Sequence, residues 1–560
     1  MTLIRIKNGT VYDPANGRNG VVMDLWIRDA SMVDGPTPEE LPDQIIDANG
    51  LVIMPGGVDM HCHIVGPKVN MARKMRPEDH RDAPPVPRTT ITRSGTTGSV
   101  PSSFATGYLY AGLGYTTAVD AAIPPLSALH AHEEFLDTPI LDKAFLILMG
   151  NNYYALKALA EGEYERARAF TGWLLESSRG YGIKVVNPGG VEAWKTGWDN
   201  IHSLDEKVPH LDCTPRMILK GLAQIAMDLH LPHSVHVHCN NLGLPGNSAT
   251  TLASMEALEG RRAHLTHIQF HSYGGDSNDQ GSFCSDVPAL ASWINAHPEV
   301  TVDVGQVLFG PTTSMTGDGP LGYFLHKVTG RKWTSSDTEL EAGCGIVPIV
   351  YKEKSFVHGL QWAIGLEWYL LVNDPWQVVM STDHPNGASF VSYPEIIALL
   401  MDRNYRNEIL KRVHPRVRER CVLADIDREY SLQEIAIISR AGPARILGMT
   451  NKGHLGAGAD ADITIYTPDT DRRRMFELPR AVIKSGRVVV DRGEIREDIL
   501  GRVWHVRPGY DSGVLPDIRK WFDAFVTVRF DNYGVDESCL AGMGAVSPCA
   551  PKSTRKGSVS

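Results

Sequence analysis

The chain has 560 residues and a formal net charge of −10, and 21% of its residues are Asp, Glu, Lys or Arg. These charges form no long acidic or basic run, which argues against nucleic-acid binding as the main role and suits a soluble enzyme or subunit. No apolar run reaches the length of a membrane span, and the N-terminus lacks the apolar core of a secretory signal, so we expect a cytoplasmic protein. The eight cysteines include no Cys-x-x-Cys pair, which excludes a disulfide framework, an iron–sulfur motif and a zinc ribbon.

Short stretches that alternate apolar and polar residues occupy both ends of the predicted fold. Residues 1–53 contain three of them, separated by turn residues, and the same pattern returns over 453–494. Because neither end alone can bury a sheet, we expect residues 1–53 and 446–500 to build one composite β-sandwich domain. Residues 501–560 would then form a C-terminal extension, disordered from about residue 540.

The middle of the chain, residues 54–445, alternates strand-like and helix-like segments. Helix-compatible segments such as 163–179 and 215–230 separate short β-rich apolar strings. Eight such strings predict a (β/α)₈ TIM barrel, an α/β fold whose functional sites lie at the C-terminal ends of the strands. The predicted strands are 58–64, 115–123, 144–152, 182–190, 234–241, 264–271, 301–310 and 377–385. Two insertions, 74–103 after the first strand and 311–345 after the seventh, would then lie over the site as long loops.

Histidine, lysine and aspartate residues stand at the ends of five predicted strands. His61 and His63 lie two residues apart, so on a strand both imidazoles project to the same side. Converging imidazoles suit a borderline metal such as zinc. Two such ions about 3.5–4 Å apart would use roughly six ligands and leave room for water. The six expected ligands are His61, His63, Lys184, His238, His267 and Asp383.

Each of these residues also has a plainer interpretation. Lys184 could be a buried ion-pair partner, and Asp383 could cap a helix or a turn. Two of the histidines have neighbours that could serve as ligands instead. The joint pattern, in one order along the strands, is more specific than any single member. The competing residues are His236 for His238, and His264 and His271 for His267.

Lys184 needs a chemical explanation, because an ammonium group is a poor metal ligand. A neutral lysine amine can add carbon dioxide and become a carbamate, an anion with two oxygens that could bridge two cations. Burial disfavours the ammonium form and makes the neutral amine accessible. We therefore expect Lys184 to be N6-carboxylated and to bridge two divalent metal ions, which we expect to be Zn²⁺.

The string Pro-Gly-Gly-Val-Asp-Met-His-Cys-His over 55–63 resembles the first-strand signature of the amidohydrolase superfamily. This resemblance extends over about residues 1–500 and implies a composite β-domain, a barrel and a binuclear metal centre that hydrolyses amide-like bonds. Hydantoinases and dihydropyrimidinases typically carry Glu-Asn where this chain has Cys239-Asn240, which weakens a cyclic-amide interpretation. Four strings resemble the A subunit of formylmethanofuran dehydrogenase more closely: 182–190, 236–243, 264–274 and 380–387.

The resemblance implies a subunit that hydrolyses N-formyl-methanofuran, or a bacterial analogue, to formate and the free amine. Such subunits assemble into a formylmethanofuran dehydrogenase or a formyltransferase/hydrolase complex. The chain lacks the Lys/Glu enrichment of a hyperthermophile, which favours the bacterial complex. In the implied mechanism Asp383 takes the proton of an attacking water and delivers it to the leaving amine. The alternatives are a hydantoinase-like cyclic amide hydrolase and a catalytically dead scaffold subunit.

Substrate contacts are expected from two regions. Asn240, Asn241 and Gln269 follow the predicted histidine ligands closely along the chain. Arg88 and Arg93 lie in the first insertion and could bind the acidic glutamyl tail of a methanofuran-type carrier, since arginine matches carboxylates. A solvated basic loop or a contact with another protein of the complex would explain both arginines equally well.

Overall fold

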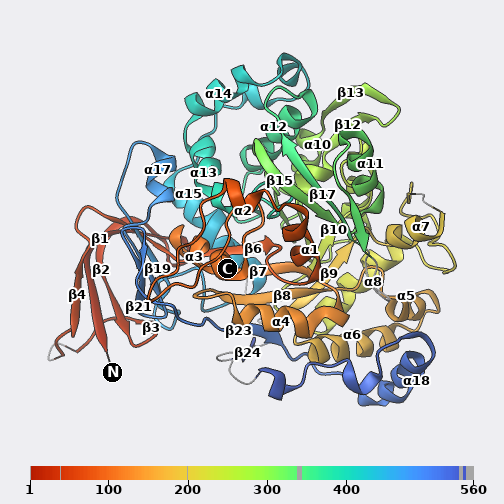
Figure 1. Ribbon diagram of the computed structural model, residues 1–560, viewed down its shortest axis with the longest axis horizontal. Helices are drawn as coiled ribbons and strands as arrows, with labels where there is room; N and C mark the ends of the chain where they lie inside the picture. The colour runs from red at the N-terminus through yellow and green to blue at the C-terminus, as the bar shows by residue number, and fades with distance from the viewer. Residues whose placement is uncertain (1, 38–39, 198–199, 337–343, 541–545, 550–560) are drawn as a thin grey trace.

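The computed structural model describes residues 2–37, 40–197, 200–336, 344–540 and 546–549. Within them, eight parallel strands pair in chain order. A β-bridge between Cys62 and His384 joins the first strand of this sheet to the segment that follows its last strand, so the sheet curls into a barrel (Figure 1). The predicted α/β barrel is confirmed. The strands are β6 (Gly57–Cys62), β7 (Tyr115–Ile123), β8 (Asp142–Leu148), β9 (Gly182–Val186), β10 (Val235–His238), β11 (Ala263–Leu265), β14 (Val300–Asp303) and β18 (Val378–Val379).

Several strands end earlier than the sequence pattern predicts. The backbone leaves the extended conformation near the site, with φ of 35° at His267 and 50° at Asp383. A positive φ is uncommon for residues other than glycine and redirects the chain. The apolar strings therefore continue as loops that carry functional side chains over the barrel mouth.

Helices cover the outside of the barrel (Figure 1). Helix α8 (Pro215–Asp228) shows how the sequence starts such a helix. The Thr214 side chain caps its N-terminus by accepting a hydrogen bond from the Met217 amide, and Pro215 occupies the first turn. Its apolar positions Ile218 and Leu222 are buried. The other covering helices include α3 (Ser103–Gly112), α4 (Ala128–Leu136), α5 (Tyr153–Ala160), α6 (Tyr164–Ser178), α7 (Gly190–Gly197), α9 (Asn247–Ala257), α10 (Val287–Ala296), α12 (Phe356–Leu371), α13 (Tyr393–Met401), α14 (Arg403–Arg412), α15 (Leu432–Ala436) and α16 (Gly442–Leu447).

Strands from both ends of the chain form a second sheet beside the barrel, at the left of Figure 1. Its halves join where β5 (Val52–Pro55) pairs antiparallel with β19 (Ile463–Tyr466). Ile6, Ile27 and Ile483 pack in a core of its own, as the prediction of a composite β-domain requires. Its other strands are β1 (Leu3–Asp13), β2 (Arg18–Arg28), β3 (Ser31–Val33), β4 (Gln44–Asp47), β20 (Ala481–Lys484), β21 (Arg487–Asp491) and β22 (Glu494–Ile495), and α17 (Arg472–Glu477) follows β19. The domain boundaries expected from the sequence stay predictions.

A buried ionic network joins this sheet to the barrel. The Asp142 carboxylate, at the start of β8, contacts the Nζ atoms of Lys452 and Lys484. The Asp462 carboxylate contacts the same nitrogens at 2.7 and 2.8 Å. All four side chains are almost fully buried. The network therefore fixes the base of the barrel, opposite the site.

The two insertions pack against each other above the barrel mouth. The first contains α1 (Pro67–Met75) and α2 (Asp79–Asp82). The second folds as an antiparallel sheet of β15 (Gly310–Thr316), β16 (Thr334–Ser336) and β17 (Cys344–Tyr351), with α11 (Gly319–Thr329) beside it. Val69 and Ala72 meet Met315 and Ile346 in a small apolar core. The second insertion, which was expected to be a long loop, is thus a small folded sheet and helix above the barrel mouth. Residues 337–343 of this insertion lie outside the described residues.

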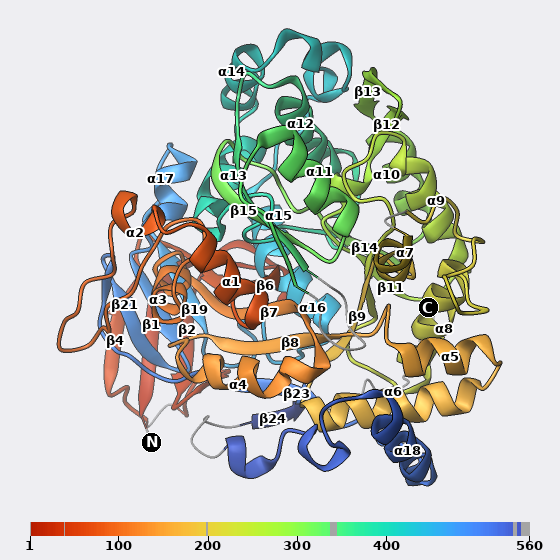
Figure 2. The same cartoon turned by 45° about the vertical axis from the view of Figure 1, so that its right-hand side comes forward.

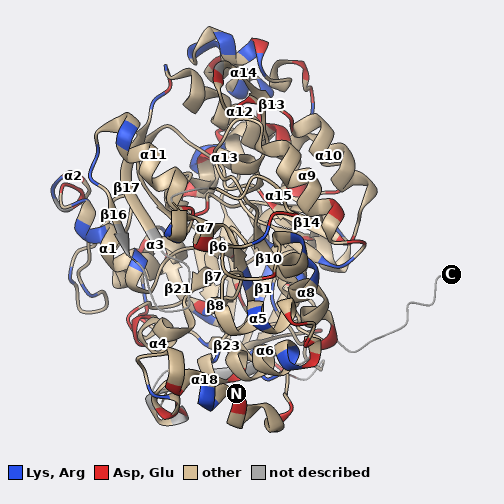
Figure 3. Ribbon diagram, turned by 90° about the vertical axis from the view of Figure 1, so that its right-hand side faces the viewer, with Lys and Arg blue, Asp and Glu red and all other residues tan. Residues whose placement is uncertain are grey.

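The C-terminal extension lies along the barrel wall. Strand β23 (Val503–Val506) pairs with β8, and α18 (Leu515–Phe525) lies beside α6 (Figure 2), where Phe522 packs on Trp173. The tail expected to be disordered falls largely outside the described residues, and β24 (Val546–Cys549) pairs with β23. Residues of both charge signs are spread over many elements (Figure 3). Among the described residues, no helix combines the length and apolarity needed to cross a membrane.

Candidate metal centre

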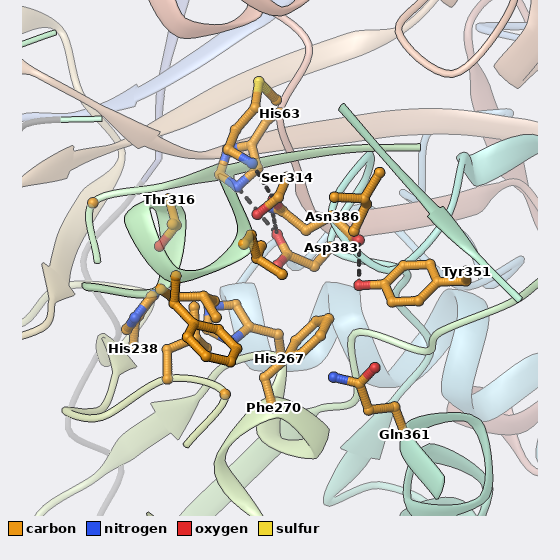
Figure 4. A pocket seen from close by; sticks show the side chains of 18 of the residues that line it. His63, His238, His267, Phe270, Ser314, Thr316, Tyr351, Gln361, Asp383 and Asn386 are labelled. Carbon is orange, nitrogen blue, oxygen red and sulfur yellow. Dashed lines mark hydrogen bonds and ion pairs between the residues drawn. The ribbon is translucent and has the colours of Figure 1, made fainter. Parts of the chain in front are cut away.

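The C-terminal ends of the barrel strands open into a cavity of about 520 Å³. All six expected ligands line it, and Figure 4 shows four of them around its floor. The second insertion supplies much of the remaining wall. Apolar side chains predominate there, including Phe270, Leu321 and Tyr351. The sequence-based set of ligands is therefore brought together in one place.

His61, His63 and Asp383 form one ligand group. Asp383 Oδ1 lies 3.2 Å from His61 Nε2 and 3.1 Å from His63 Nε2 (Figure 4). Asn386 Nδ2 donates to the same oxygen at 2.9 Å. Burial alone would raise the pKa of Asp383, but the charge of His61 and hydrogen bonds from His61 and His63 outweigh it and hold that pKa well below its usual range. The carboxylate is therefore anionic and suited to bind a cation.

His238 and His267 belong to a second group, which meets the first at His267, since one nitrogen of His267 also lies within 4.8 Å of ligand atoms of His61 and Asp383. The nitrogens of His238 and His267 lie within 4.8 Å of one another and of His271. His238 Nε2 and His267 Nδ1 are buried without a hydrogen-bond partner. Burial lowers the pKa of His267 to about 3 and that of His238 well below its usual value. Both imidazoles are thus neutral at physiological pH, with lone pairs available to a metal.

Lys184 lies on β9 among these groups, 1% exposed, with no hydrogen-bond partner for Nζ. No carboxylate of the described residues lies within ion-pair distance of it, so the plain ion-pair interpretation gains no support. Burial lowers its pKa to about 7, against the opposing effect of Asp303 and Asp383. A neutral amine is therefore readily populated. A buried amine without a hydrogen-bond partner, surrounded by acceptor atoms, is consistent with a lysine that is carboxylated on Nζ.

Asp303, which the sequence reasoning missed, organises the layer beneath the ligands. Its carboxylate lies 3.0 Å from His61 Nδ1 and 3.1 Å from His264 Nε2, and accepts from the His267 amide at 2.9 Å. His236 Nε2 lies 3.0 Å from His61 Nδ1. His236 and His264, considered as rival ligands, thus lie below the cavity. Asp303 ends β14 (Val300–Asp303), whereas the predicted seventh strand extends from 301 to 310, so its place at a strand end was not evident from the sequence.

The structure does not bring the expected substrate contacts to the cavity wall. Asn240 donates to Asn187 Oδ1 at 2.8 Å, and Asn241 to Thr250 Oγ1 at 3.2 Å. Gln269 accepts a long hydrogen bond, 3.4 Å, from Tyr273. Each amide makes a hydrogen bond within the protein, although Asn240 Oδ1 and Gln269 Nε2 have no partner, and their role as substrate contacts stays a prediction.

The arginines of the first insertion also lie elsewhere. Arg88 is exposed, and Arg93 pairs with Asp498 at 3.4 Å and Asp137 at 3.7 Å. The cations that line the cavity are instead Lys68, Arg331 and Lys352. Among the described residues no carboxylate forms an ion pair with these three side chains, whose positive charge is therefore available to a ligand.

Comparisons with known proteins agree with this geometry. Residues 44–490 match the model of the amidohydrolase family. Protein FwdA of Methanocaldococcus jannaschii is 45% identical over 556 residues, which cover 95% of this chain and 96% of that protein. The A subunit of the formyltransferase/hydrolase complex Fhc of Methylorubrum extorquens is 41% identical over 548 residues, covering 96% and 97%.

A solved structure is similar over the whole chain. In the crystal structure of the formyltransferase/hydrolase complex FhcABCD from Methylorubrum extorquens with methylofuran, one chain aligns with a TM-score of 0.92 and 37% identity. The alignment covers 99% of this chain and 100% of that one. With its barrel, its histidine-rich strand ends and these full-length relatives, the chain belongs to the amidohydrolase family.

Proposed function

We propose that this chain is the A subunit of a formyltransferase/hydrolase-type complex. It hydrolyses the N-formyl bond of a methanofuran-type carrier to formate and the free amine. The observation that carries this proposal is the convergence of six ligand-type residues on one cavity, in a chain alignable end to end with the A subunit of the Fhc complex. The related complex binds methylofuran. The relatives include both FwdA and the Fhc protein, so the choice of the bacterial complex over the methanogen complex stays a prediction. A cytoplasmic location also stays a prediction.

The residues fit two divalent metal ions, which we take to be zinc. His61, His63 and Asp383 would hold one ion, and His238 and His267 the other. Lys184, as a carbamate, would bridge them: its neutral Nζ adds to the carbon of CO₂, the N–C bond forms and one proton leaves the nitrogen. When bound, such ions activate water and polarise a carbonyl group. The orphaned nitrogens of His238, His267 and Lys184 support this assignment.

Asp383 is suited to move the proton that hydrolysis requires. As an anion it can accept the proton of the attacking water and then deliver it to the nitrogen of the leaving amine. The C–N bond breaks as that proton arrives, so formic acid and the neutral amine form, and the acid releases its remaining proton to solvent and leaves as formate. Asn386 and His63 hold Oδ1 in place at 2.9 and 3.1 Å. Fixed geometry of this kind lowers the entropy cost of the transfer.

The cavity wall supports an elongated substrate with an acidic end. Phe270 and Leu321 offer an apolar surface to the body of the carrier. Lys68, Arg331 and Lys352 offer positive charge to carboxylates of a glutamyl tail. A small cyclic amide such as dihydrouracil would use neither feature.

A substrate panel tests the proposal. The purified protein with its natural partner subunits should release formate from an N-formylated methanofuran-type carrier, and should leave hydantoin and dihydrouracil intact. Replacing Arg331 and Lys352 by alanine should raise KM for a glutamyl-tailed substrate more than for a truncated one. The matched control replaces Arg88 and Arg93, which line no part of the cavity, and should change neither KM. Turnover of cyclic amides without formate release would reject the proposal.

A further inference from the structure

His271 is an anomaly in the barrel interior. It ends the short 3-10 helix η3 (Ile268–His271), its side chain is 0% exposed, and no hydrogen bond of good geometry reaches either ring nitrogen, although the Asn240 backbone lies close enough to interact with the ring. A buried polar group left without a partner costs about 1–3 kcal/mol. Nothing in the proposed division of ligands uses this residue. A fully buried imidazole with at least one nitrogen left without a protein partner calls for a group that proteins bind through such nitrogens.

The surroundings of His271 point to a metal ion. Its ring centroid lies 5.1 Å from that of His238 and 5.2 Å from that of His267. The three residues bring one ligand nitrogen each to within 4.8 Å of one another. His238 Nε2 and His267 Nδ1 are orphaned as well. Three buried imidazoles with nitrogens this close together match the nitrogen-rich donor sets that zinc prefers.

The local backbone explains how a third histidine reaches this point. His267 adopts a left-handed conformation, and one turn of η3 follows it directly. This short turn stacks the rings of His267 and His271 at an interplanar angle of 26°, so both imidazoles lie beside one group. Phe270, between them, turns toward the cavity and lines it, whereas His271 does not. His271 therefore approaches from behind the cavity wall.

We propose that His271 is a third imidazole ligand of the metal ion that His238 and His267 hold. The inference rests on the proposed function, because it assumes that the chain binds metal at this cavity. With three imidazoles and the Lys184 carbamate as ligands, this ion has fewer positions open to substrate.

Metal affinity rather than activity tests the inference. Metal should be stripped from the wild-type complex and from the His271→Ala variant, and zinc binding then measured by chelator competition, with metal content measured on the reloaded protein. Removing even an outer partner of a metal ligand typically weakens binding about 10- to 100-fold. We therefore expect at least this loss for one of the two ions, with the other nearly unchanged. Cobalt-substituted protein should also show an altered visible spectrum, since loss of one nitrogen changes the coordination.

Two further variants separate a ligand from a buried side chain. His132→Ala removes another fully buried imidazole, one hydrogen-bonded to the Ser178 carbonyl at 3.1 Å, and should leave both affinities unchanged. His271→Phe keeps the space filled in case the alanine variant does not fold, and should show the same loss of metal. Wild-type affinity for two ions in His271→Phe would overturn the inference. A wild-type protein that binds no metal would instead refute the proposed function.

Discussion

Replacing Asp303 by asparagine tests whether the layer beneath the ligands sets the properties of the metal centre. The carboxylate serves three donors: His61 at 3.0 Å, His264 at 3.1 Å and the His267 amide at 2.9 Å. Burial would raise its pKa, but His61 and His264 hold that pKa well below its usual range, so the group is an anion. Asparagine has nearly the same shape, but it lacks the charge and has only one acceptor oxygen. At least one donor then loses its partner, whichever way the amide is turned.

The size of the effect follows from these contacts. A hydrogen bond to a charged group contributes about 1.5–3 kcal/mol. At about 1.4 kcal/mol per factor of ten, its loss corresponds to roughly 10- to 150-fold. Losses typical of outer partners of metal ligands fall in the same range, about 10- to 100-fold. Asp303→Asn should therefore lower zinc affinity, or kcat/KM for formate release, by one to two orders of magnitude.

The assay combines chelator competition with formate release at saturating metal. Thr301→Val is the matched control, because it removes only the outer partner of His264, at 2.8 Å. A neutral hydrogen bond is worth about 0.5–1.5 kcal/mol, so this change should cost no more than roughly tenfold. If Asp303→Asn keeps wild-type affinity and turnover while folding normally, the buried carboxylate does not orient the ligands and the reasoning fails.

Three other changes probe the ligands and the fold. Lys184→Ala should abolish loading of the metal pair. In the wild-type protein, intact-peptide mass spectrometry should find one added CO₂ on Lys184 and none on Lys143. Lys143 is the control because it is equally buried and its pKa is also lowered to about 7, but its Nζ is hydrogen-bonded to two carbonyls. Full loading of the alanine variant would contradict the bridging carbamate. Asp383→Asn should keep bound metal while kcat falls on the order of 10²–10⁴-fold, and near wild-type turnover would remove Asp383 as the proton carrier. Asp142→Asn should lower the free energy of unfolding by about 3–5 kcal/mol, because it leaves two buried lysines short of a counter-charge, as urea unfolding would measure. Despite burial, the two lysines hold the pKa of Asp142 below its unfolded value of about 3.9. The stabilisation from the Asp142 carboxylate is complete above that pH and is lost as the pH falls below it. The free energy of unfolding of the variant should therefore depend less on pH in acid, and an unchanged pH dependence would count against the network.

The barrel and its ligands were predictable because their signals are local. His61 lies on β6 and His63 follows its last residue, and each later candidate lies on, or a few residues after, one strand of a repeating unit, so chain order alone brings them to one edge. Asp303 closes β14, but the predicted seventh strand extended to residue 310, so the early end of this strand concealed it. The local sequence pattern was enough to predict the ligands because, in this barrel, the position of a residue along a strand determines which end of the barrel it reaches.

The cavity wall was not predictable in this way. Arg93 lies in a polar segment typical of a mobile loop, but it pairs with Asp498, which the other end of the chain supplies. Arg331 and Lys352 reach the cavity because the second insertion folds back as a sheet on α1. Which cation faces a ligand depends on such long-range packing, and composition alone carries no record of it. His271 was noticed only as a rival to His267, because its orphaned nitrogens are visible only in three dimensions.

Formate release as a function of bound metal tests the central claim most directly. The complex should be stripped of metal, reloaded stepwise with zinc in the presence of bicarbonate, and assayed on an N-formylated methanofuran-type carrier at each loading. The account predicts little activity without metal and full activity at about two ions per chain. Full formate release by the metal-free protein, or none at full loading, would contradict it.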